Sequence, residues 1–436
     1  MDKEIIKQYL IDSKDKKLEN VLPRETSLKS SSKIQAVIGA RRTGKTHLLY
    51  NRMKELQKEG ISKERIIYLN FENPVLDDVS YKEFKNIIEL HWSLYPASAK
   101  EKTYLFIDEP QVIPNWERAV RSLYDELNAE ICITGSSSRL LEKEISASLR
   151  GRSLKTLLLP LSFREFLRFK NIDYSQNLSS KKKASIIHYF NEYLKNGAYP
   201  EITREKSEED KLKILKEYFD LTIFKDLIDR YNINNTRLIK TLIDLAVASC
   251  SKEFSVSKHY NDLKSRGFKL GKSTMYEYFS NLEDSMFIFS LKKFSYSQKT
   301  QDLSVPKIYL GDVGFLSLYF RENYGQRLEN AVFLELLRQT SRNPRKSLNY
   351  WQSPGGLETD FVISDGKTPQ TAIQVSYNIS NPATKKREIN SLLACMQELN
   401  LKKGLILTQY EEGQEKIDGK TIQITPAWKW LLSLPQ

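Results

Sequence analysis

A glycine-containing stretch, GARRTGKTHLL at residues 39–49, carries residue types that bind phosphate. Gly39, Gly44, Lys45 and Thr46 fill the fixed positions of the phosphate-loop pattern G-x-x-x-x-G-K-[ST]. In that pattern the loop N–H groups cradle phosphate oxygens, the lysine contacts the β and γ phosphates, and the hydroxyl ligands Mg²⁺. The stretch therefore predicts a site for ATP and Mg²⁺. The residues expected to line it are Gly39, Ala40, Arg41, Arg42, Thr43, Gly44, Lys45, Thr46 and His47.

The residues on either side of this stretch favour a phosphate loop. Residues 33–38, KIQAVI, alternate and end apolar like a buried strand, and residues 47–56 carry apolar side chains at helical spacing. Strand, glycine loop and helix is the order that the pattern requires. The alternative is an ordinary glycine turn between a strand and a helix, with Lys45 solvated at the surface.

The stretch YLFIDE, residues 104–109, supplies the other half of a nucleotide site. Its apolar part predicts a central strand that ends at Asp108, which can hold Mg²⁺, and Glu109 can polarise the attacking water as a general base. The alternative is a strand end with a capping carboxylate. Because the stretch follows a phosphate loop, the pair predicts ATP hydrolysis.

Two later stretches offer contacts to the γ-phosphate. In TGSSS, residues 134–138, Ser136 is the expected γ-phosphate sensor, and a serine turn is the alternative. In LRGR, Arg150 and Arg152 are expected to act as an arginine finger, either in cis or from a neighbouring subunit. Their alternative role is a surface salt bridge.

The elements that would position these residues alternate between strand and helix. Near-continuous apolar runs predict strands at residues 33–38, 65–71, 103–108, 130–134 and 155–159. Amphipathic segments such as residues 115–128 separate them. Apolar strands that alternate with helices indicate a parallel sheet covered on both faces. The first domain is therefore expected to be a three-layer α/β phosphate-loop fold.

Further along the chain the periodicity changes twice. Residues 162–231 have helical spacing throughout, and residues 235–297 read as three short helices followed by strands at 286–291 and 293–296. Strands and helices mix again from residue 306. The predicted domains are an ATPase domain with an N-terminal helical extension (1–160), a helical lid or connector (161–234), a small third domain (235–305) and a second α/β domain (306–436).

The composition of the 436 residues is that of a water-soluble, cytoplasmic protein. Hydrophobic residues make up 40%, no apolar run is long enough to span a membrane, and the start MDKEIIKQYL is unlike a secretory signal. Cys132, Cys250 and Cys395 are isolated, which argues against a disulfide framework and a zinc site. The formal net charge of +13 favours an anionic partner such as DNA, and a generally basic surface is the alternative.

Taken together, several motifs resemble those of the archaeal-type AAA-like ATPases that carry a winged-helix segment and a C-terminal domain of unknown function. They are GARRTGKT, YLFIDEPQ, TGSSSRL, LRGRSLKTLLLPLSFREFL, GAYPE (197–201), LGDVGF (310–315) and YWQSPGGLETDFVI (350–363). The resemblance implies this architecture, a DNA connection through the winged helix, and a last domain similar to the PD-(D/E)xK nucleases. It implies no particular substrate.

The third domain contains a candidate recognition helix of the winged helix at residues 272–282. Its apolar positions would face inward, while Lys272 would remain available to DNA phosphates or base edges, and Arg266 adds charge just upstream. The alternative is a small domain that contacts other proteins.

The last domain contains only part of a nuclease-like site. Glu329 and Asp360 match the first acids of such a site, but Gln374 stands in place of the second carboxylate and Ser376 in place of the lysine. Because a serine hydroxyl supplies no positive charge and no lysine lies in that strand, we expect no DNA cleavage. The alternative role of Asp360 is a structural carboxylate.

These features predict a Mg²⁺-dependent ATPase whose nucleotide state controls a winged-helix domain and a degenerate nuclease-like domain on DNA. Two alternatives remain at this stage: an ATP-gated, metal-dependent DNA nuclease, and an ATP-binding signalling switch that acts through protein partners. A homo-oligomer or a protein partner is compatible with each of them, and no membrane partner is expected.

Overall fold

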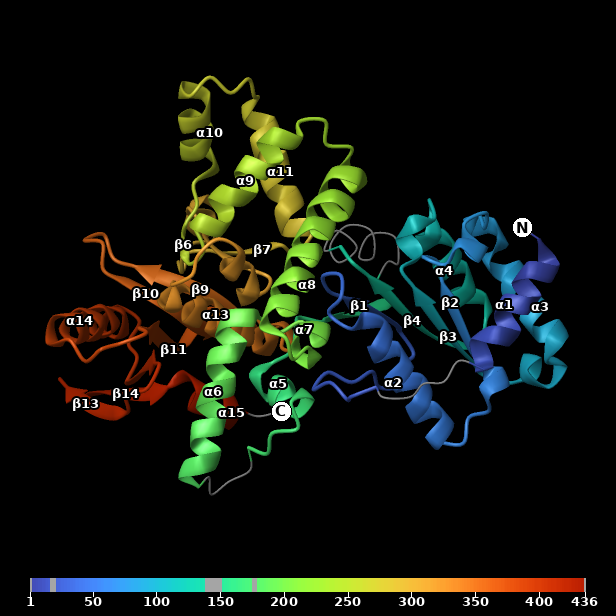
Figure 1. The fold of residues 1–436 in the computed structure, drawn as a ribbon, viewed down its shortest axis with the longest axis horizontal. Coiled ribbons are helices and arrows are strands. Elements are labelled where there is room, and N and C mark those ends of the chain that lie inside the picture. Colours follow the sequence, from blue (N-terminus) through green and yellow to red (C-terminus); the bar gives the residue numbers. More distant parts are fainter. Residues whose placement is uncertain (1, 16–20, 138–150, 175–178, 435–436) are drawn as a thin grey trace. The chain divides into compact units, whose positions relative to one another are not determined.

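A five-stranded parallel sheet lies at the centre of Met1–Leu158, the first of two compact units in the computed structural model. The structure describes residues 2–15, 21–137, 151–174 and 179–434. The strand order is β2-β3-β4-β1-β5 (Figure 1). The strands are β1 (Ile34–Ile38), β2 (Ile66–Asn70), β3 (Thr103–Asp108), β4 (Ala129–Gly135) and β5 (Ser153–Leu157). Every residue of β1 and β3 is buried, as in sheets covered on both faces, and the predicted parallel α/β sheet is confirmed.

Four α-helices accompany this sheet within the part of Met1–Leu158 that the structure describes. They are α1 (Lys3–Asp15), α2 (Lys45–Lys58), α3 (Phe84–Leu94) and α4 (Trp116–Glu126). Helix α2 buries Leu48, Leu49 and Leu56 in one apolar cluster with β1, β2 and β3. Because α2 begins directly after the glycine loop, this packing fixes the first helical turn relative to the ends of the strands.

The second unit, Leu159–Gln436, begins with helices. These are α5 (Phe163–Phe169), α6 (Ser180–Asn196), α7 (Pro200–Arg204) and α8 (Glu208–Leu221), followed by a π-helix at Thr222–Asp229. A capping box starts α5: the Ser162 hydroxyl accepts the Glu165 N–H at 3.1 Å, and the Glu165 carboxylate accepts the Ser162 N–H at 2.9 Å. The motif LPLSFREF therefore includes a helix start.

Four α-helices and a small antiparallel sheet come next along the described chain. The elements are α9 (Thr236–Ala248), β6 (Lys252–Glu253), α10 (Val256–Ser265), α11 (Lys272–Asp284), β7 (Ile288–Leu291), α12 (Gln298–Leu303) and β8 (Lys307–Leu310). The strand order is β6-β8-β7. The predicted strand at 293–296 is wrong, because Lys293 makes only an isolated bridge to Tyr350 and β7 pairs with β8. The predicted boundary at 305/306 therefore cuts this sheet.

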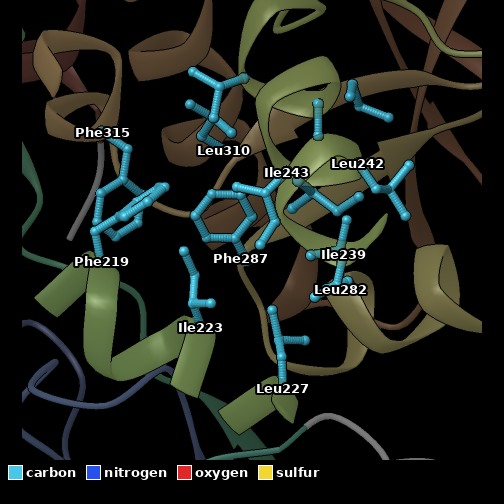
Figure 2. Packing of buried hydrophobic residues seen from close by; sticks show 14 of the residues in the cluster. Phe219, Ile223, Leu227, Ile239, Leu242, Ile243, Leu282, Phe287, Leu310 and Phe315 are labelled. Atoms are coloured by element: carbon cyan, nitrogen blue, oxygen red, sulfur yellow. The ribbon is translucent and has the colours of Figure 1, made fainter. Parts of the chain in front are cut away.

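The predicted connector and the following helices share one apolar core. Figure 2 shows Phe219 from α8, Ile223 and Leu227 from the π-helix, and Leu282 from α11 in the same apolar cluster as Phe287. Each large apolar side chain buried in this way contributes about 1.5–3 kcal/mol relative to an exposed one. These segments therefore share one hydrophobic core within the second unit.

A six-stranded mixed sheet forms the rest of the second unit, in the order β13-β14-β12-β11-β10-β9 (Figure 1). The strands are β9 (Lys346–Gln352), β10 (Glu358–Asp365), β11 (Thr368–Val375), β12 (Lys403–Thr408), β13 (Gly413–Ile417) and β14 (Lys420–Pro426). The helices are α13 (Tyr324–Ser341), α14 (Pro382–Glu398) and α15 (Ala427–Ser433). Among the described residues, no helix has both the length and the apolar character needed to cross a membrane.

The motifs GAYPE and LGDVGF meet inside the second unit. Gly197 has φ 79°, and a Cβ there would lie 1.8 Å from Asp312 Oδ1. The Asp312 carboxylate accepts N–H groups from Ala198 at 2.9 Å and Gly314 at 2.8 Å. Burial raises the pKa of Asp312 to about 7, although both hydrogen bonds favour its charged form. Glycine at 197 therefore makes room for a buried carboxyl group.

Candidate functional site

The phosphate loop runs from the end of β1 to the start of α2. A Cβ on Gly39 would lie 2.2 Å from the Leu158 carbonyl oxygen, and Gly44 has φ 96°. Both positions therefore require glycine, one for space and one for backbone conformation. The Thr43 hydroxyl donates to the Ala40 carbonyl at 2.9 Å, which closes the turn.

Lys45 lies buried inside this loop. Its ammonium group donates to the carbonyls of Gly39 at 3.0 Å and Ala40 at 3.1 Å, and it pairs with Glu109 at 3.1 Å. Burial alone would raise the pKa of Glu109, but the Lys45 charge and a hydrogen bond from Gln111 outweigh it, so the pKa is lowered. Glu109 is thus held as a carboxylate beside the loop.

Asp108 collects three hydroxyl groups at the end of β3. The hydroxyls of Thr46 and Tyr68 each donate to Asp108 Oδ2 at 2.8 Å, and Thr134 donates to Oδ1. Burial raises the pKa of Asp108 despite these hydrogen bonds. Carboxylate and hydroxyl oxygens are the ligands that Mg²⁺ prefers, so Thr46 and Asp108 fit the ion that a nucleotide would bring.

Thr134 connects the two acidic residues. Its hydroxyl accepts the Glu109 N–H at 3.1 Å while it donates to Asp108, so one side chain orients both. Sequence reasoning selected Ser136 instead, which is buried and directly follows Gly135, whose carbonyl accepts the Gly39 N–H at 3.3 Å. Alternation along a strand places residues two apart on the same side, and that signal could have indicated Thr134 as well.

Other loop residues contact their surroundings. Arg41 pairs with Glu72 at 2.7 Å, and the His47 ring packs edge-on against Tyr50 with centroids 5.8 Å apart. Sequence reasoning missed Arg24, whose guanidinium donates to the Thr43 carbonyl at 2.6 Å. No sequence motif indicates Arg24, because it lies 19 residues before Thr43 and only the fold brings the two residues together.

The structure does not bring Arg152 to the phosphate loop. Arg152 lies at the amino ends of β1 and β5, where its carbonyl accepts the Ile34 N–H at 2.9 Å and its side chain pairs with Asp125 at 2.9 Å. The loop begins at the other end of β1, about 16 Å away at roughly 3.3 Å per residue. In this arrangement Arg152 makes no cis contact with the loop. Ser138 and Arg150 lie outside the described residues.

The candidate DNA-contacting residues are exposed on α10 and α11. Arg266 follows α10 and pairs with Asp262 at 3.0 Å, with 67% of its side chain exposed. Lys272 is the first residue of α11 and is also exposed. The Tyr276 hydroxyl lies 2.8 Å from the Ser257 hydroxyl, which links the two helices at the surface.

The nuclease-like residues only partly converge. Glu329 on α13 and Asp360 on β10 lie together, and Gln374 accepts the Asp360 N–H at 3.3 Å and donates to Glu388 at 2.8 Å. The Ser376 hydroxyl instead faces the Asn378 carbonyl at 3.5 Å. A lysine is nevertheless present, because Lys307 on β8 reaches both acids. From the sequence, we looked for a lysine in the strand that contains Gln374, whereas Lys307 belongs to β8.

Comparisons with known proteins define the class. Residues 31–167 match the AAA domain family, residues 187–347 match one domain of unknown function (DUF8612), and residues 324–430 match another (DUF4143). The first match covers the phosphate loop, Asp108 and Glu109. The chain therefore carries an AAA-type ATPase domain, and this part of the predicted resemblance is confirmed.

Two relatives extend over nearly the whole chain. The uncharacterized protein MJ1544 of Methanocaldococcus jannaschii is 37% identical over 446 residues, which cover 99% of this chain and 96% of that protein. An uncharacterized protein of Haemophilus influenzae is 31% identical over 421 residues, which cover 95% of this chain and 98% of that protein. The chain belongs to the same family as these archaeal and bacterial proteins.

Solved structures overlap with the chain more loosely. The Aeropyrum pernix ORC1 protein in complex with DNA shares 14% identity over 64% of this chain and 83% of that one, with a TM-score of 0.28. AMPPCP-bound DnaA from Aquifex aeolicus shares 14% identity over 71% of this chain and 91% of that one, with a TM-score of 0.24. The assignment rests on the AAA match and the two relatives.

Proposed function

We propose that the protein is a cytoplasmic Mg²⁺-dependent ATPase whose nucleotide state controls DNA binding through a winged helix and a degenerate nuclease-like domain. One observation carries the ATPase part. The loop lysine, a hydroxyl, an aspartate and a glutamate converge at the carboxyl ends of β1 and β3. The four residues are Lys45, Thr46, Asp108 and Glu109. This set supplies phosphate binding, Mg²⁺ ligation and water activation together.

The contacts of these residues suggest what each would do. The loop N–H groups would cradle the phosphates, and Lys45 would exchange its carbonyl partners and Glu109 for phosphate oxygens. Thr46 and Asp108 would hold Mg²⁺, which when bound neutralises charge on the phosphates. Glu109, released from Lys45 and positioned by Gln111, would orient the attacking water and accept its proton. Ser136 remains the proposed γ-phosphate sensor.

The DNA part rests on element order and surface charge. The order α9-β6-α10-α11-β7-α12-β8, with an antiparallel three-stranded sheet, supports the proposal of a winged helix in which α11 would be the recognition helix. Lys272 at the start of α11 and Arg266 beside it are exposed cations of the kind that contact DNA phosphates. DNA is therefore the proposed partner of this face.

ATP turnover with and without duplex or single-stranded DNA tests the proposal. Wild-type protein should hydrolyse ATP, and DNA should change the rate. Lys45→Ala should lose ATP binding because the phosphates lose their buried cation, whereas Glu109→Gln should bind ATP and lose turnover by about 100-fold or more. Equal ATP affinity in wild type and Lys45→Ala would refute the site. A rate unaffected by DNA would refute only the coupling.

A further inference from the structure

Lys307 is a buried lysine surrounded by three carboxylates. Its side chain is about 2% exposed, and its ammonium nitrogen lies 3.1 Å from Glu329 Oε1, 2.8 Å from Glu358 Oε1 and 3.0 Å from Asp360 Oδ1. A lysine ammonium has three N–H donors and no acceptor. The ammonium group of Lys307 donates hydrogen bonds to Glu329 and Asp360 and forms an ion pair with Glu358.

The cluster joins two sheets of the second unit. Lys307 starts β8 of the three-stranded sheet, Glu358 and Asp360 lie on β10 of the six-stranded sheet, and Glu329 lies on α13. Two of the acids have further partners, since the Tyr309 hydroxyl donates to Glu329 at 2.8 Å and the Val375 N–H donates to Asp360 at 2.8 Å. The carboxylate of Glu358 is the most exposed of the three, at 34%.

A divalent metal does not fit this cluster beside the lysine. Mg²⁺ and Ca²⁺ bind oxygen ligands at about 2.0–2.6 Å, and the ammonium group already occupies the space between the same oxygens. A second cation there would also be repelled by the first. With Lys307 in place, no group of three or more His, Cys, Asp or Glu side chains among the described residues is arranged to hold a metal ion.

We propose that Lys307 is the resident cation of this carboxylate cluster and takes the place of the metal of a nuclease-like site, so that its removal opens a divalent-cation site at Glu329, Glu358 and Asp360. The inference rests on the nuclease-like part of the proposed function and not on the ATPase part. It explains how the acids of such a site persist without a metal: one covalently attached charge compensates them and ties the two sheets together.

Four proteins form the test: wild type, Glu358→Gln, Lys307→Ala and the double variant. Each is melted in increasing Mn²⁺, and Mn²⁺ binding is measured by calorimetry. Lys307→Ala should melt below wild type without metal because its acids lose their cation. Mn²⁺ should restore its melting temperature and bind with one additional ion per chain, and the double variant should lose both effects.

Wild type and Glu358→Gln provide a comparison that does not depend on the folding of Lys307→Ala. Mn²⁺ at the nucleotide site contributes equally to all four proteins and cancels, so failure of the ATPase proposal leaves this test unchanged. The proposal expects the same Mn²⁺-dependent shift in wild type and Glu358→Gln. A larger shift in wild type, no gain of Mn²⁺ in folded Lys307→Ala, or Mn²⁺-dependent DNA cleavage that requires Lys307 would overturn it.

Discussion

At the residue scale, the hydroxyl group of Thr134 forms hydrogen bonds with two acidic residues, Asp108 and Glu109. It accepts the backbone N–H of Glu109 and donates to the carboxylate of Asp108, so it fixes the proposed general base relative to the proposed Mg²⁺ ligand. Tyr68 and Thr46 complete the hydrogen bonds of Asp108. The geometry of the site thus depends on residues outside the phosphate-loop and Asp-Glu motifs.

We expect Thr134→Val to lower ATP turnover about 10–100-fold with little change in ATP affinity, as is typical when a group that orients a ligand is removed. Valine keeps the shape but leaves the Glu109 N–H without this acceptor. Thr134→Ser keeps the hydroxyl and should restore most of the activity. Single-turnover kinetics measure the rate of hydrolysis, and a separate titration measures ATP affinity. Equal turnover in wild type and Thr134→Val would contradict the proposed role of Thr134 in orienting Glu109.

A second prediction at this scale concerns Asp312 and pH. Its folded-state pKa of about 7 lies above the usual value of 3.8, so the native protein binds the proton more tightly than the unfolded chain. The free energy of unfolding should therefore fall as pH rises from about 4 to 7, by up to roughly 1.4 kcal/mol per pH unit.

Asp312→Asn supplies the control, because it cannot titrate. One of its two backbone N–H partners then faces the amide nitrogen, so this variant should be less stable at pH 4, but its slope between pH 4 and 7 should be smaller. Chemical unfolding at several pH values measures both slopes. Identical slopes would show that Asp312 is not the titrating group.

At the element scale, β8 connects the three-stranded sheet of the second unit with α13 and β10. All of its residues are buried, and it pairs with β6 and β7 while its first residue, Lys307, reaches the acids on α13 and β10. A four-residue strand carries no local signal of its partners. The same strand therefore belongs to the three-stranded sheet by hydrogen bonding and to the carboxylate cluster by charge.

The exposed cations of α10 and α11 give a prediction at this scale. If Arg266 and Lys272 contact DNA phosphates, replacing both with alanine should weaken binding to all sequences and flatten the dependence of log K on log salt by about 0.9 per lost contact. Asp262 partly neutralises Arg266, so Lys272 should contribute more. Fluorescence anisotropy at several salt concentrations measures the slope.

Lys213→Ala is the matched control, since this lysine is 65% exposed and belongs to α8 and not to the proposed recognition helix. Like each of the other two substitutions, Lys213→Ala removes one positive charge, but it should leave the slope of log K against log salt nearly unchanged. If the Arg266 and Lys272 double variant also keeps the wild-type slope, this face contacts proteins and not DNA.

At the scale of the whole molecule, the AAA domain does not occur alone. The two long relatives align with nearly the full chain, so their common length includes the regions matched by both domains of unknown function. The proposed coupling between ATP turnover and DNA belongs to this scale.

A prediction about assembly follows from the position of Arg152. Because it lies at the far end of β1 from its own phosphate loop, it can act as an arginine finger only on a neighbouring subunit. Mixing Lys45→Ala with a variant in which Arg150 and Arg152 are both alanine should then recover some ATPase activity at mixed interfaces. No recovery, although the two variants co-assemble by native mass spectrometry, would exclude a finger in trans.

The sequence by itself determined the parts of this protein whose signals are local. Phosphate-loop spacing placed Lys45 and Thr46, and an apolar strand ending in Asp-Glu placed Asp108 and Glu109, because backbone geometry brings neighbouring residues into fixed relation. Apolar periodicity likewise predicted the parallel sheet. Each of these inferences needs only a few consecutive residues and the strand, loop or helix that they form.

Only the tertiary structure decided which distant residues meet. Thr134 reaches the two acids because β4 lies between β1 and β3, and Arg152 is separated from the loop because parallel pairing puts it at the opposite strand end. Lys307 reaches Asp360 across 53 positions of sequence, although the strand expected to carry a lysine has a serine. A buried charge can be compensated from any element that packs against it, so its partner is set by the fold and not by spacing along the chain.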